Sequence, residues 1–143
     1  MKSILHICLT LAASLSVFAA DSPAKPLEGK WLPVAAQLGG QAMDDAILKT
    51  ISLKLESGKY EVFVGEHPDR GTYTTDATTS PKSITVVGTE GPNQGKTFPA
   101  IYELKDDTLR ICYDLSGAKR PTEFKSVAGT KLYLVTYKRK RDA

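Results

Sequence analysis

The side chains most often used in catalysis are scarce in this chain. Its histidines are His6 and His67, and its cysteines are Cys8 and Cys112. Nucleophilic catalysis by serine or cysteine needs a base within hydrogen-bond reach, and no sequence signature surrounds His67. A zinc site normally needs three or four His, Cys or carboxylate ligands, which one histidine and one distant cysteine do not supply. We therefore expect no catalytic residue, metal site or cofactor, and no enzymatic activity.

Two other patterns invite a chemical interpretation. The loop from Gly91 to Thr97 ends in Gly-Lys-Thr, as a phosphate-binding loop does, but it is one residue short and Phe98-Pro99 leads into a predicted strand instead of a helix. A hairpin loop explains this sequence. The acidic pairs Asp44-Asp45 and Asp106-Asp107 fit a helix start and a turn. Carboxylates that meet only in the folded chain, as in glycosidases, stay open.

The aromatic residues of the predicted strands are the remaining candidates for a functional site. Those that face the interior of a sheet would line a cavity with apolar surface and hydroxyl groups. The ligand-binding candidates are Tyr60, Phe98, Tyr102 and Tyr113. A cavity of roughly 300 Å³ or more would favour binding of a small apolar or amphipathic ligand. A filled interior would instead favour an interaction module whose loops contact a protein or a polymer.

Residues 1–20 have the pattern of a secretory signal peptide. Lys2 precedes an apolar run from Ile4 to Ala13, and Val17-Phe18-Ala19 offers small residues at the cleavage positions. Cleavage after Ala19 or Ala20 fits equally well, and a retained signal anchor is the alternative. The apolar run is too short to span a bilayer. We expect an exported protein, periplasmic or extracellular, whose residues 21–26 form an exposed lead-in.

The remaining chain has the usual size of one domain. It keeps one cysteine, so no intramolecular disulfide is possible, and without Lys2 it has 18 basic against 16 acidic residues, a formal charge of +2. The one basic cluster, residues 138–141, would attract nucleic acid or anionic lipid, or is a solvated end of which residues 140–143 form a tail. No second basic stretch accompanies it, so we expect no nucleic-acid partner, and we expect a monomer.

Alternation of apolar and polar residues predicts mostly strands. Ile51, Leu53 and Leu55 alternate with polar residues, and similar extended segments are predicted at 32–38, 60–64, 70–75, 83–87, 98–104, 109–113 and 131–137. Met43, Ala46, Ile47 and Thr50 share one face and predict a helix of about two turns. About eight strands joined by turns, with no room for crossover helices, predict an all-β, antiparallel up-and-down barrel over residues 27–139.

Five motifs in order resemble an uncharacterised bacterial domain family, best known from planctomycetes and similar to lipocalins. They are Leu27-Glu28-Gly29-Lys30-Trp31, residues 91–97, Ile101–Leu104, Asp107–Tyr113 and Arg120–Phe124. The resemblance covers Leu27 to about Arg139 and implies an exported lipocalin-like barrel, with no established activity or ligand. It also implies that Trp31, after the turn at Gly29, stacks beneath an arginine that follows the last strand. Arg139 stands in that position, and Lys138 and Arg141 are the alternatives.

Overall fold

The computed structural model describes residues 25–141. The predicted signal peptide and most of the predicted lead-in lie outside them. A 3-10 turn, η1 (Lys25–Leu27), precedes the sheet, and one helix, α1, spans Asp45–Leu48. The strands are β1 (Gly29–Leu38), β2 (Gln41–Ala42), β3 (Ile51–Glu56), β4 (Lys59–Val64), β5 (His67–Asp76), β6 (Lys82–Glu90), β7 (Thr97–Lys105), β8 (Thr108–Asp114) and β9 (Leu132–Lys140).

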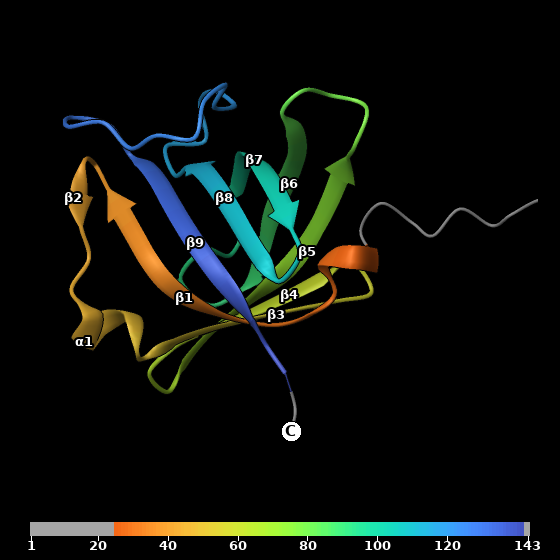
Figure 1. Ribbon diagram of the computed structural model, residues 1–143, viewed down its shortest axis with the longest axis vertical. Helices are drawn as coiled ribbons and strands as arrows, with labels where there is room; N and C mark the ends of the chain where they lie inside the picture. The colour runs from red at the N-terminus through yellow and green to blue at the C-terminus, as the bar shows by residue number, and fades with distance from the viewer. Residues whose placement is uncertain (1–24, 142–143) are drawn as a thin grey trace, which may run out of the picture.

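Eight antiparallel strands close into an up-and-down barrel, which confirms the predicted fold class. Each strand from β3 to β8 pairs with the next one in sequence, and β1 pairs with both β3 and β9. The short β2 pairs with the end of β1 outside this ring. Figure 1 shows the closure, where the last strand lies along the first. Closure leaves none of the eight barrel strands as a long open edge.

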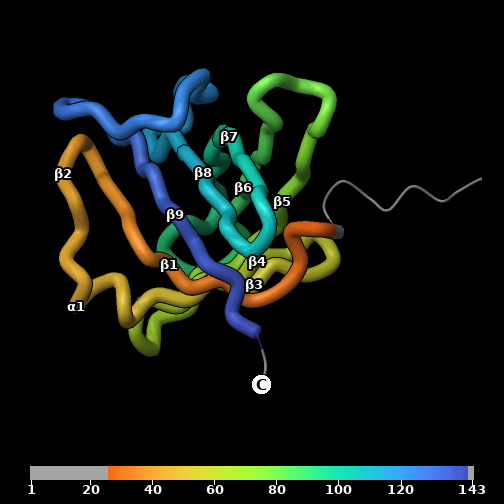
Figure 2. Tube along the Cα trace, in the orientation of Figure 1, coloured from red at the N-terminus to blue at the C-terminus, as the bar shows by residue number. Residues whose placement is uncertain are grey.

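The two ends of the barrel differ. At the closed end, Leu27, Trp31, Tyr102 and Leu109 are buried and pack into one core cluster. The other end carries the longer connections, at residues 39–50, 91–96 and 115–131 (Figure 2). Strand β1 pairs with β3 only from Gly29 to Trp31 and then continues beside β9, with β2 on its other side only at Gln37 and Leu38. The interior is therefore filled at one end and widens toward the other.

The helix after the first strands is present but shorter than predicted. It forms a single turn, and it buries Leu48 while Ile47 stays 45% exposed, so the predicted apolar face is wrong. The helix does not continue through Thr50. The backbone N–H of Thr50 donates to Ile47 O, three residues back, and strand β3 begins at the next residue. A one-turn helix contributes little stability of its own, and the pairing of β3 determines where it ends.

The connection between β8 and β9, residues 115–131, lies against the outside of the barrel. Arg120 donates to the carbonyl oxygens of Ile84 and Ala100, at 2.9 and 2.7 Å, and to the Thr85 hydroxyl at 2.7 Å. Residues 122–125 form no strand. Beneath this connection Cys112 is fully buried, and burial raises the pKa of its thiol. This cysteine is therefore a packed side chain on the outer face of β8.

Candidate ligand cavity

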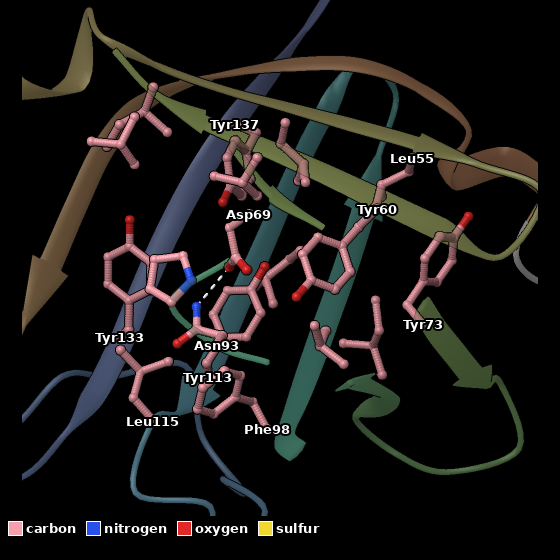
Figure 3. A pocket seen from close by; sticks show the side chains of 18 of the residues that line it. Leu55, Tyr60, Asp69, Tyr73, Asn93, Phe98, Tyr113, Leu115, Tyr133 and Tyr137 are labelled. Atoms are coloured by element: carbon pink, nitrogen blue, oxygen red, sulfur yellow. Dashed lines mark hydrogen bonds between the residues drawn. The ribbon is translucent and has the colours of Figure 1, made fainter. Parts of the chain in front are cut away.

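A cavity of about 270 Å³ lies inside the barrel (Figure 3). Its wall is largely aliphatic and aromatic, from side chains of the seven strands β3 to β9: Ile51, Leu53, Leu55, Val62, Ile84, Val86 and Ile111, with Tyr60, Tyr73, Phe98, Tyr113, Tyr133 and Tyr137. The volume is just below the roughly 300 Å³ that we took as favouring a ligand and at which typical ligand pockets begin. Any molecule held in this space must therefore be small.

Strand pairing determines which side chains reach this space. Tyr60, Val62 and Val64 of β4 alternate inward, and their partners on β5 are Gly71, Asp69 and His67. Gly71 leaves room for the phenol ring of Tyr60. A Cβ atom at position 71 would lie 2.5 Å from Tyr60 Cε1 and 1.9 Å from the carbonyl oxygen of Val87. The glycine thus allows the tyrosine ring to lie flat against the β5 backbone.

Three of the four candidate aromatic residues line the cavity. Tyr60, Phe98 and Tyr113 contribute to its wall, and Tyr102 does not. Phe98 and Tyr102 point to the same side of β7, but they are four residues apart, which is about 13 Å along a strand. Tyr102 therefore packs in the core at the closed end, where it is 4% exposed.

Polar side chains that are not among the predicted ligand-binding residues also line the cavity. His67 and Asp69, expected in a loop, are the start of β5 and line the cavity, and Asn93 reaches it from the loop after β6. Gly88 allows this loop to fold close to the strand, since a Cβ there would lie 2.0 Å from Asn93 O. Every second residue of β5 faces inward, and this alternation could have indicated that His67 and Asp69 line the interior. The pattern was hard to detect because the inward positions His67, Asp69 and Gly71 carry no large apolar side chain.

Asp69 lies among hydroxyl groups inside the cavity. Asn93 Nδ2 donates to Asp69 Oδ2 at 2.6 Å. The other carboxylate oxygen, Asp69 Oδ1, has no hydrogen-bond partner within the described residues, and neither do the hydroxyl groups of Tyr60 and Tyr73. Burial and the negative charge of Asp69 raise the pKa of Tyr60 to about 12. Burial also raises the pKa of Tyr113, whose ring stacks on that of Tyr133 with centroids 5.8 Å apart.

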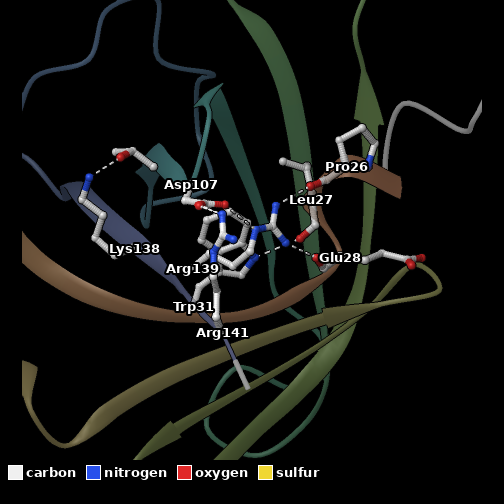
Figure 4. Close-up of polar contacts among 9 residues, drawn as sticks. Pro26, Leu27, Glu28, Trp31, Asp107, Lys138, Arg139 and Arg141 are labelled. Carbon is white, nitrogen blue, oxygen red and sulfur yellow. Dashed lines mark hydrogen bonds and ion pairs between the residues drawn. The ribbon is translucent and has the colours of Figure 1, made fainter. Parts of the chain in front are cut away.

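At the closed end, Arg139 covers Trp31 (Figure 4). The guanidinium carbon lies 4.3 Å from the centre of the indole ring. Arg139 also donates to the carbonyl oxygens of Glu28 at 2.5 Å and Pro26 at 2.9 Å. Gly29 makes this approach possible, because its φ is +131° and a Cβ would lie 2.8 Å from Arg139 Nη1. Lys138 instead donates to the Thr108 hydroxyl, and Arg141 to Asp107.

Other kinds of site find little support in the described part of the chain. No group of three or more histidine, cysteine, aspartate or glutamate residues among residues 25–141 is placed to hold a metal ion. Nor does any helix within that range have the length and hydropathy needed to cross a bilayer. The cavity is thus the feature of these residues with the clearest chemical character.

Fold and cavity together define a class: a small closed antiparallel barrel with one plugged end and an apolar, tyrosine-rich interior. Comparisons with protein-family models, with curated proteins and with solved structures gave no match.

Proposed function

We propose that this protein is an exported lipocalin-like barrel that binds a small amphipathic molecule in its interior. The observation that supports binding most directly is the 270 Å³ cavity, whose aliphatic and aromatic wall surrounds a few polar atoms. Ligand sites commonly combine a largely apolar wall with a few well-placed polar groups. The signal-like pattern of residues 1–20 supports export.

The alternative is an extracytoplasmic interaction module with a packed core. Its specific support is the outer face of β1, where Leu32 and Val34 are 40% and 51% exposed. Single exposed apolar side chains are normal on soluble proteins. An unfilled interior is not expected for a packed module, because voids larger than a water molecule are few in protein cores. The cavity therefore favours ligand binding.

Native mass spectrometry of protein purified from its own host tests this proposal. We expect a co-purified small molecule, and the Val62→Phe variant, which adds a ring inside the cavity, should lose it. Val34→Phe makes the same change on an exposed position and should retain it. Displacement of an apolar fluorescent dye provides a second measurement. A wild type that carries no small molecule and binds no dye, or equal binding by the Val62→Phe variant, would contradict the proposal.

A further inference from the structure

The cavity contains buried polar atoms that the protein itself does not satisfy. Tyr60 is 94% buried, and neither its hydroxyl nor Asp69 Oδ1 has a hydrogen-bond partner among the described residues. Leaving such an atom unpaired costs about 1 to 3 kcal/mol, and more for a charged group. Native proteins keep few of these atoms, and those at binding sites are often satisfied by a ligand. Figure 3 shows both groups at the centre of the cavity.

Asp69 also has no ion-pair partner within residues 25–141. Among the described residues no lysine or arginine lines the cavity, and His67 is the basic side chain of its wall. The neighbouring Arg70 binds Glu61 at 2.7 Å and Glu90 at 3.3 Å instead. A partly buried carboxylate with no opposite charge is costly unless a positive group from outside compensates it. A positively charged group inside the cavity would therefore be stabilised by Asp69.

The aromatic wall has the same preference. The faces of tyrosine and phenylalanine rings carry partial negative charge and attract cations within about 6 Å of the ring centre. Tyr60, Tyr113, Tyr133 and Tyr137 line the space around Asp69, and the rings of Tyr113 and Tyr133 stack. An anionic ligand would meet both the carboxylate and these ring faces unfavourably.

We propose that the ligand is a small organic cation, a protonated amine attached to an apolar group. This inference rests on the proposed function and specifies the ligand class. The ammonium group donates to Asp69 Oδ1 and to the Tyr60 hydroxyl oxygen, while the apolar group lies against Leu53, Val62 and Val86. The third unpartnered atom is the Tyr73 hydroxyl, which does not bind the ammonium group. It lies on the side of Glu28, whose negative charge, after burial, raises the pKa of Tyr73.

Three probes of similar size test the charge preference: phenethylamine, phenethyl alcohol and hydrocinnamate. In calorimetric titrations of the wild-type protein at neutral pH, we expect the amine to bind at least about tenfold more tightly than the alcohol, and the anion to bind least. This comparison needs no variant. Tighter binding of the alcohol or the anion would overturn the ammonium inference and leave the proposed function standing, whereas no binding of any probe would count against both.

Variants then locate the charge that matters. Asp69→Asn keeps the shape and an acceptor for Asn93, and we expect it to weaken amine binding by about tenfold while the alcohol binds as before. Glu66→Gln removes one negative charge from the exposed loop before β5 and should change the affinity less than about twofold. Melting curves of each variant establish that it is folded. Equal losses in both variants, or an Asp69→Asn variant that binds the amine normally, would overturn the proposal.

Discussion

At the scale of single residues, Arg139 connects the last strand, β9, with residues 26–31. Its guanidinium stacks on Trp31 and donates to backbone carbonyls of Pro26 and Glu28, and its Nε lies 3.3 Å from Asp107 Oδ1. A stacked guanidinium needs its planar fork for these contacts, which a lysine does not have. The side chain thus fixes the N-terminal turn onto the closed end of the barrel.

Replacing Arg139 by alanine should lower the free energy of unfolding by about 2 kcal/mol, since a cation–π contact and three charge-assisted hydrogen bonds are lost. Denaturant unfolding measures this change. Lys138→Ala is the matched control, because it removes the same charge from the adjacent residue, whose contact is an exposed hydrogen bond to Thr108. Equal effects of the two substitutions would show that the stacking on Trp31 contributes nothing of its own.

At the scale of elements, the β8–β9 connection supports a weak point of the sheet. Pro99 of β7 lies opposite Thr85 of β6, and proline has no backbone N–H to donate to the ladder. Arg120 supplies donors there, to the carbonyls of Ile84 and Ala100 and to the Thr85 side chain. A segment without strand structure therefore holds two strands together from outside the barrel.

Arg120→Ala should destabilise the fold by about 2 to 3 kcal/mol, because it leaves carbonyl oxygens beneath the connection unpaired. Thermal unfolding is the measurement. The adjacent Lys119→Ala variant loses the same charge but keeps its contact to Asp114, which is made by the backbone N–H of residue 119. If the Arg120→Ala variant melts at the same temperature as the Lys119→Ala control, Arg120 does not have this role.

The strands and their closure were predictable because alternation reports which face of a strand is buried. The side chains that line the cavity could not be predicted in the same way, for physical reasons. Alternation separates inside from outside but not depth, so Phe98 and Tyr102 looked equivalent. Asp69 is polar yet faces inward, and Asn93 arrives through a loop whose path depends on Gly88. Register shifts at Pro33/Ala35 and Arg70/Gly71 add offsets that composition does not reveal.

At the scale of the whole molecule, the tyrosines link burial to pH. Burial is the first cause of a raised pKa at every tyrosine of the chain: Tyr60, Tyr73, Tyr102, Tyr113, Tyr133 and Tyr137. In the unfolded chain a phenol titrates near about 10. As the pH rises from about 10 to 12, the unfolded state loses these protons first, while the folded state keeps them. Stability present below about pH 10 is therefore lost across that interval.

Denaturant unfolding at about pH 9 and pH 11, with phenolate absorbance recorded in parallel, checks this expectation. We expect the unfolding midpoint to fall at the higher pH and phenolate to appear together with loss of the β-sheet circular dichroism. Lysine deprotonation also lowers stability at high pH, so Tyr60→Phe serves as the control: it removes one phenol whose pKa is raised to about 12, and its midpoint should fall less than that of the wild type. If the phenols ionise near pH 10 while the sheet stays intact, the tyrosine hydroxyl groups are open to solvent, and the cavity does not provide the dry interior that recognition of a cation by Asp69 needs.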